Sequence, residues 1–221
     1  MKLTEIQKEL APEVYAILSK DIQTLTPAQT KAVKAGLFEN KNLLVCTPTA
    51  SGKTLIAELA ATTAIAQNKG KAVYIVPLKA LASEKYKDFK KRYDGLFKIA
   101  LSVGDTDAAD TYLSNYDFIV CTAEKLDSLI RHHTPWLKNV AVIIVDEIHL
   151  LNDATRGPTL EILLTLLRRL LKDVQIIALS ATIGNEKELA KWLKATLIED
   201  TWRPVKLEKG VYFNKEIEFD D

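Results

Sequence analysis

The chain has 221 residues, 48% of them hydrophobic, which is enough to bury the core of one large α/β domain. Thirty basic side chains stand against 29 acidic ones, so bulk charge cannot drive nucleic-acid binding, and any such contact must come from local patches or backbone amides. The two cysteines fit no metal-ligand spacing and are typical of reduced thiols. With no signal-peptide pattern and no apolar run near the roughly 18 residues of a membrane span, we expect a soluble, cytoplasmic protein without a membrane partner.

Short helical pieces are predicted before the first strand. Thr4 and Gln7 have the spacing of a capping box, and Pro12 fits the first turn of a second piece. Thr26 followed by Pro27 fits the N-cap and first turn of a third.

Short apolar runs then alternate with helical patterns. Strands are expected at 42–46, 72–76, 98–101, 117–121, 141–145, 175–180 and 196–199. Helices are expected at 53–67, 79–93, 106–114, 123–132, 157–171 and 186–193. Continuous apolar runs suit strands that are covered on both faces, so the pattern predicts a mostly parallel sheet between two helical layers.

The octet 47–54 follows an apolar run and leads into helix-prone sequence. This order of strand, loop and helix is typical of a phosphate-binding loop, with Lys53 reaching the outer phosphates and the Thr54 hydroxyl holding Mg²⁺. Thr47 replaces the usual first glycine of the pattern, so the octet alone leaves a chance match open. The predicted nucleotide-binding residues of the loop are Thr47, Pro48, Thr49, Ala50, Ser51, Gly52, Lys53 and Thr54.

Polar residues also follow two later strands. Asp146 and Glu147 come directly after an apolar strand, where they are expected to face the same crevice as the octet, although acids at a strand end can also simply open a turn. Ser180 and Thr182 end the next strand and could hydrogen-bond to either carboxylate, the alternative being a plain helix N-cap.

Together with Gln29 and His149, these stretches resemble the first RecA-like domain of superfamily-two helicases of the DExH type. The segments 77–81, 122–125 and 202–205 narrow the resemblance to the Ski-two-like group, and most closely to archaeal DNA-repair helicases of the Hjm type. The fold implied is an α/β RecA-like P-loop NTPase domain, with a mostly parallel central sheet and helices on both faces. The expected divisions are a helical extension at 1–24, the ATP-binding domain at 25–210 and the start of a linker at 211–221.

The resemblance also implies a role for each matching residue. Gln29 reads the adenine edge, Lys53 and Thr54 bind phosphates and Mg²⁺, Asp146 supports the metal, and Glu147 is the catalytic base. The residues that couple hydrolysis to domain movement are His149, Ser180 and Thr182. The residues that contact the backbone of a nucleic-acid strand are Pro77, Lys79, Ala80, Gly104, Asp105, Thr122, Glu124 and Lys125.

The function implied is the motor domain of an ATP-dependent 3′–5′ DNA helicase in replication-fork repair and recombination, with ATP and Mg²⁺ as cofactors and single-stranded or forked DNA as partner. A second RecA-like domain, which supplies arginine fingers worth about 10³ to 10⁵ in rate, lies outside this sequence, so the chain is expected to bind nucleotide but hydrolyse it weakly. An RNA helicase or remodeller of the same family and a nucleotide-dependent binding module remain open alternatives.

One basic run carries little weight in this reading. It comprises Lys85, Lys87, Lys90, Lys91 and Arg92. Acidic residues are interleaved with it, which favours a solvated helix face over a binding surface.

Overall fold

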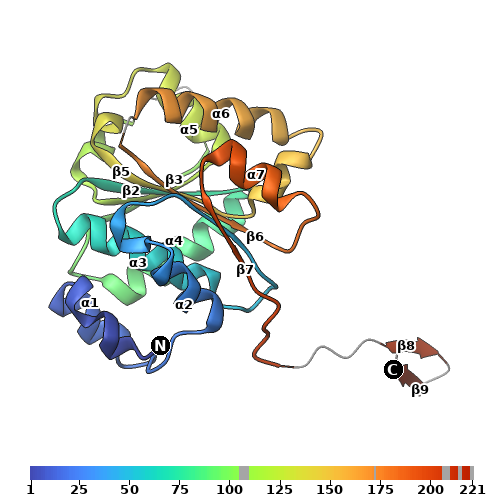
Figure 1. Cartoon of the computed structure of the whole chain (residues 1–221). Helices are drawn as coiled ribbons and strands as arrows, with labels where there is room; N and C mark the ends of the chain where they lie inside the picture. The colour runs from blue at the N-terminus through green and yellow to red at the C-terminus, as the bar shows by residue number, and fades with distance from the viewer. Residues whose placement is uncertain (105–109, 172, 206–209, 214–215, 220–221) are drawn as a thin grey trace.

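The computed structural model describes residues 1–104, 110–171, 173–205, 210–213 and 216–219. Within them, a seven-stranded sheet runs in the order β3-β4-β2-β5-β6-β1-β7, and every neighbouring pair is parallel (Figure 1). Its strands are β1 (Leu43–Cys46), β2 (Lys71–Val76), β3 (Ile99–Ser102), β4 (Phe118–Thr122), β5 (Val140–Val145), β6 (Gln175–Ser180) and β7 (Thr196–Glu199). Each predicted strand is confirmed to within one residue at either end.

Helices cover both faces of this sheet (Figure 1). The principal ones are α3 (Lys53–Ala66), α4 (Lys79–Tyr93), α5 (Ala123–Arg131), α6 (Gly157–Leu170) and α7 (Glu186–Leu193). Of the predicted helix at 106–114, residues 106–109 fall outside the described residues, and the described remainder forms a 3-10 helix, η3 (Thr111–Asn115), in place of an α-helix. Further 3-10 turns are η2 (Leu37–Glu39), η4 (Pro135–Asn139) and η5 (Ile148–Asn152).

Successive side chains of the central strands enter two separate hydrophobic clusters. Along β2, Tyr74 packs with α3 and α4, whereas Val73 and Ile75 pack with α5 and α6. Strand β5 alternates in the same way, with Ile144 on the first side and Ile143 on the second. The apolar runs are therefore buried on both faces, which is the physical reason that the sequence shows no polar alternation there.

The N-terminal helical pieces are η1 (Leu3–Glu9), α1 (Pro12–Leu18) and α2 (Pro27–Lys34), and they share the core of α3 and α4. The starts at Pro12 and at Thr26 are confirmed. The predicted capping box at Thr4 and Gln7 is wrong: Lys2 is extended and bridges Thr24, so the chain enters the helix at residue 3 and Thr4 lies inside it. The N–H of Lys2 donates instead to Glu5 Oε1 at 2.5 Å.

Two antiparallel strands, β8 (Gly210–Phe213) and β9 (Glu216–Phe219), follow at the C-terminal end and pair with each other. No helix in the described part of the chain is long and apolar enough to cross a bilayer. Both cysteines are free and buried, Cys46 at the end of β1 and Cys121 within β4.

Candidate functional site

The carboxyl ends of three adjacent strands, β5, β6 and β1, bring the main candidate residues to one place. The octet 47–54 follows β1, Asp146 follows β5, and Ser180 ends β6. The N–H of Thr47 donates to the carbonyl of Ser180 at 3.3 Å, which ties the loop to the neighbouring strand. This edge of an open parallel sheet is where such folds bind ligands.

The loop itself is held in a tight curve. Ala50 and Gly52 have positive φ values of 65° and 85°, a backbone shape that turns successive N–H groups inward. The hydroxyl of Thr47 lies 2.7 Å from that of Ser51, a bond that a glycine at position 47 could not make. Thr47 in place of the usual first glycine therefore does not disrupt the loop. Lys53 Nζ donates to the carbonyls of Thr47 and Pro48, at 2.8 and 3.2 Å.

Gln29 braces the loop from helix α2. Its Nε2 donates to the Gly52 carbonyl at 3.0 Å, and its Oε1 accepts from the N–H of Thr26 at 2.8 Å. A Cβ added to Gly52 would lie 2.4 Å from Gln29 Nε2, so a larger residue here would push this amide out of its position. A side-chain amide has two hydrogens and two acceptor sites, which leaves Gln29 one of each for a further partner such as a purine edge.

The acid pair is anchored by a tyrosine that the sequence reading missed. Asp146 Oδ2 accepts from the Tyr74 hydroxyl at 2.8 Å, and Oδ1 accepts from the N–H of Glu147 at 3.1 Å. Burial, followed by the charge of Asp146, holds the pKa of Tyr74 well above its ordinary value, so this hydroxyl stays a donor. The backbone of Glu147 is left-handed, with φ 52°, and His149 Nδ1 lies 3.2 Å from Glu147 Oε2.

The ammonium of Lys53 responds to both carboxylates. Burial lowers the pKa of Lys53, while the charges of Glu147 and then Asp146 raise it and so partly offset the burial. The site thus gathers one cation and two acids from the ends of β1 and β5, which is the composition that phosphoryl transfer requires.

The predicted contacts from β6 to the acids are wrong. Ser180 Oγ is buried and has no hydrogen-bond partner among the described residues, and Thr182 is exposed. Asp146 accepts instead from the Tyr74 hydroxyl and from the N–H of its neighbour Glu147. In the described part of the chain, the link from β6 to the loop is therefore its backbone carbonyl at Ser180.

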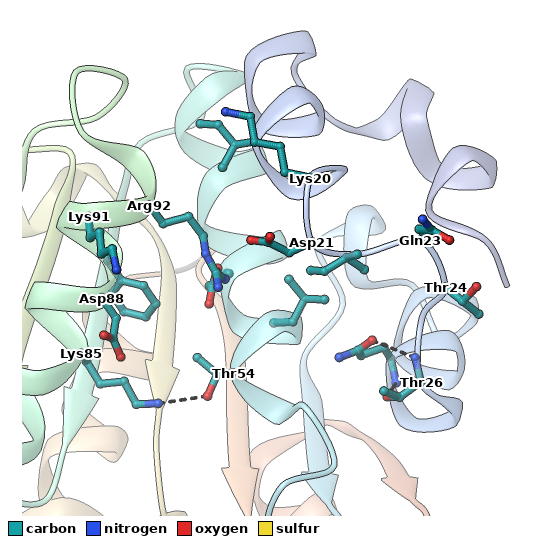
Figure 2. A pocket seen from close by; sticks show the side chains of 16 residues that line it. Lys20, Asp21, Gln23, Thr24, Thr26, Thr54, Lys85, Asp88, Lys91 and Arg92 are labelled. Atoms are coloured by element: carbon teal, nitrogen blue, oxygen red, sulfur yellow. Dashed lines mark hydrogen bonds and ion pairs between the residues drawn. The ribbon is translucent and has the colours of Figure 1, made fainter. Parts of the chain in front are cut away.

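A cavity of about 860 Å³ opens beside the loop, between the N-terminal segment, α3 and α4 (Figure 2). Gln29, Thr54 and Lys85 line it, and Lys85 Nζ donates to Thr54 Oγ1 at 3.0 Å. The predicted solvated helix face is confirmed for Lys87, Lys90 and Lys91, which are exposed, whereas Lys85 makes this contact with Thr54. Arg92 also turns inward, to Glu58 Oε2 at 2.6 Å.

The predicted nucleic-acid residues occupy the other half of the same sheet edge, after β2, β3 and β4. Lys79 and Ala80 are exposed at the start of α4, as is Glu124 at the start of α5, and Pro77 and Gly104 are half-exposed. Asp105 lies outside the described residues. Thr122 is buried, and its hydroxyl accepts from the N–H of Lys125 at 3.4 Å.

Lys125 requires a correction. Its side chain is only 3% exposed, and its Nζ lies 3.0 Å from Asp110 Oδ2, which also accepts from the Ser102 hydroxyl at 2.9 Å. Direct contact between this ammonium and a nucleic-acid phosphate is therefore not supported. Lys125 instead pairs with Asp110, which also holds Ser102 at the end of β3.

The oxygen donors near the loop suit Mg²⁺. The Thr54 hydroxyl and the Asp146 carboxylate are hard ligands, and Mg²⁺ is commonly held by one or two protein oxygens together with nucleotide phosphates. No group of three or more acidic, histidine or cysteine side chains within the described ranges could hold a metal without such a ligand. The residues fit a metal that arrives with a nucleotide.

A family model described as DEAD/DEAH box helicase matches residues 26–190. The chain belongs to this family. This DEAD/DEAH box domain is 47% identical, over its whole length, to an ATP-dependent DNA helicase Hel308 of Pyrococcus horikoshii, and 58% identical over 90% of the chain to one of Methanocaldococcus jannaschii. It spans only 30% and 17% of the lengths of these two relatives.

Solved structures of helicases share the fold of the DEAD/DEAH box domain. The DUF1998 helicase MrfA bound to DNA and AMPPNP matches 88% of the chain and 30% of its own length, with TM-score 0.76 and 29% identity. The Mycobacterium smegmatis helicase Lhr bound to single-stranded DNA and AMP-PNP matches 87% of the chain and 28% of its own length, with TM-score 0.75 and 29% identity. The RecA-like helicase fold implied by the sequence is confirmed.

Proposed function

We propose that this chain is the ATP-binding motor domain of an ATP-dependent DNA helicase. The observation that carries the proposal is the position of Lys53, which is hydrogen-bonded within the phosphate loop and is influenced by the charges of Glu147 and Asp146. The Hel308 relatives and the DNA-bound structural neighbours support DNA as the nucleic acid.

Each residue then has a chemical task. The N–H groups of the loop and of the start of α3 bind the nucleotide phosphates. Lys53 gives up its hydrogen bonds to the carbonyls of Thr47 and Pro48 and contacts the outer phosphate oxygens. Thr54 and Asp146 would hold Mg²⁺, which supplies charge neutralisation during phosphoryl transfer.

Glu147 orients the attacking water and accepts its proton. Glu147 has a left-handed backbone directly after β5, and the Tyr74 hydroxyl holds the neighbouring Asp146 through its Oδ2. His149, next to Glu147 Oε2, is placed to transmit the state of this carboxylate to a partner domain. Gln29 uses its remaining amide groups to read adenine.

Nucleotide binding and hydrolysis test these assignments separately. Lys53→Ala is expected to abolish binding of a fluorescent ADP analogue to the 221-residue chain, because the loop loses its cation. Glu147→Gln, made in the longer protein, is expected to retain binding and to lose hydrolysis. Glu84→Gln, at an exposed position on α4, is the matched control and should leave both unchanged. Loss of binding in Glu147→Gln would contradict the assigned role.

The isolated chain is proposed to hydrolyse ATP feebly and to unwind nothing, because an arginine finger from a second RecA-like domain is worth about 10³ to 10⁵ in rate. Substantial DNA-stimulated turnover by the purified chain would refute this. In the longer protein we propose 3′–5′ movement on single-stranded or forked DNA, in fork repair and recombination. We keep the divisions 1–24, 25–210 and 211–221 as part of this proposal.

The choice of nucleic acid has its own test. A titration with single-stranded DNA at several salt concentrations should show binding that weakens as salt rises, since phosphate contacts dominate. Nucleotide binding without any DNA affinity would favour a nucleotide-dependent binding module. Equal processing of matched DNA and RNA strands by the longer protein would favour an RNA helicase or remodeller.

A further inference from the structure

Lys85 makes a contact that connects helix α4 to Thr54, the proposed metal ligand. Its Nζ donates to Thr54 Oγ1 at 3.0 Å, and the two side chains point toward each other across the cavity (Figure 2). Thr54 lies in the first turn of α3, directly after Lys53. The hydroxyl that would bind Mg²⁺ therefore already has a positive charge beside it.

The Lys85 ammonium is hydrogen-bonded to a neutral hydroxyl and not to a carboxylate. In the described part of the chain, no carboxylate lies within ion-pair distance of Lys85, whereas Arg92 on the same helix is paired with Glu58. A lysine ammonium is a mobile point charge on a flexible stem, so it can leave a single hydroxyl at little cost. A divalent cation at the same hydroxyl would repel it.

We propose that Lys85 is a built-in cation that occupies the approach to the Thr54 hydroxyl and is displaced when Mg²⁺ binds there with nucleotide. Lys85 acts as a positioning residue: it sets how much Mg²⁺ is needed to load the site. The inference rests on the proposed function, since it takes Thr54 as a metal ligand.

Displacement of Lys85 would act on a helix that extends to the predicted nucleic-acid side of the domain. Lys85 lies within α4, whose first residues, Lys79 and Ala80, are exposed at the end of β2. With Mg²⁺ at Thr54, α4 loses its contact with α3 at this point but keeps the ion pair between Arg92 and Glu58. Loading of Thr54 with Mg²⁺ would thus change a contact of the helix that carries Lys79 and Ala80.

The test measures Mg²⁺ dependence of nucleotide binding. At constant ionic strength, Mg²⁺ is titrated into the 221-residue chain with a fixed concentration of a fluorescent ADP analogue, and the Mg²⁺ midpoint is read. Lys85→Gln is expected to lower this midpoint by about 1.4-fold to 5-fold, the range for one partly exposed charge interaction. Binding in excess chelator should be unchanged.

Two further variants separate charge from structure. Lys85→Arg keeps the positive charge and should retain the wild-type midpoint, and Lys87→Gln removes the same charge from an exposed position of the same helix and should also retain it. An unchanged midpoint in Lys85→Gln overturns the inference. Weaker binding of Lys85→Gln in chelator also overturns it, because Lys85 would then be a phosphate ligand.

Failure of this inference and failure of the proposed function give different experimental results. If the wild-type chain binds no nucleotide, the proposed function fails at that step. If the wild type binds with Mg²⁺ dependence and Lys53→Ala does not bind, but Lys85→Gln behaves as wild type, only the role of Lys85 fails.

Discussion

Glu58 on α3 joins the phosphate-loop helix to α4. Its carboxylate is 5% exposed, and its Oε2 accepts from Arg92 at 2.6 Å and from the Tyr93 hydroxyl at 2.9 Å. The charge of Glu58 raises the pKa of Arg92 although burial alone would lower it, and the pKa of Tyr93 is held well above its ordinary value by burial and then by Glu58. Glu58→Ala removes the shared acceptor.

The expected loss of stability follows from the two donors. Arg92 is 39% exposed and regains water, so its part of the loss is about 1 kcal/mol. The Tyr93 hydroxyl is buried and loses its partner, which costs about 2 kcal/mol. The sum of about 3 kcal/mol corresponds to a fall in Tm of about 6–12 °C for a chain of this size.

Urea denaturation of four proteins checks this: wild type, Glu58→Ala, Tyr93→Phe and the double variant. Tyr93→Phe is expected to cost about 1 kcal/mol in the wild type, where its hydroxyl is bonded. In the Glu58→Ala background it should be neutral or stabilising, because the unpartnered hydroxyl is removed. An equal cost of Tyr93→Phe in both backgrounds would show that Glu58 does not satisfy that hydroxyl, and would refute the reasoning.

Two other changes test the loop and a turn. Gly52→Ala, at φ 85° and 2.4 Å from Gln29 Nε2, is expected to cost about 1–2 kcal/mol in urea denaturation and to weaken nucleotide binding. Ala50→Gly, at φ 65°, is the matched control and should be neutral or stabilising; equal effects of both changes would contradict the role of φ. The pKa of Asp153 is lowered from 3.8 to about 2, by the Thr155 hydroxyl first and then by backbone N–H groups. A lowered pKa stabilises the fold above pH 3.8 and ceases to do so as pH falls toward 2, so Asp153→Asn should lower the urea midpoint at pH 6 and have no effect near pH 2.

Local sequence was sufficient for the sheet and most helices. Runs such as Val140–Val145 are apolar because both of their faces are covered, and their ends coincide with the first polar residue. The start of α2 was predictable because Thr26 is a good N-cap and Pro27 fits the first turn. The phosphate loop and the acids after β5 were predictable because parallel strands end at one edge.

Contacts between distant segments were not predictable. Thr54 and Lys85 are 31 positions apart, and Tyr74 and Asp146 are 72 apart, so no periodicity links either pair. Their meeting depends on the distance and rotation between elements, which burial patterns leave unspecified. The burial of Lys125 was missed for the same reason, since its partner Asp110 lies 15 positions away, on the other side of β4.

The two buried cysteines make the domain convenient for site-specific labelling. Burial, reinforced by Glu186 and Glu199, raises the pKa of the Cys46 thiol to about 11, and burial raises that of Cys121 to about 12. At pH 7 about one Cys46 in 10⁴ is the reactive thiolate, and fewer of Cys121. A single cysteine introduced at exposed Lys138, at the edge of the sheet opposite the site, would react with maleimide far faster than either. A dye could then be attached away from the site with both native thiols left in place.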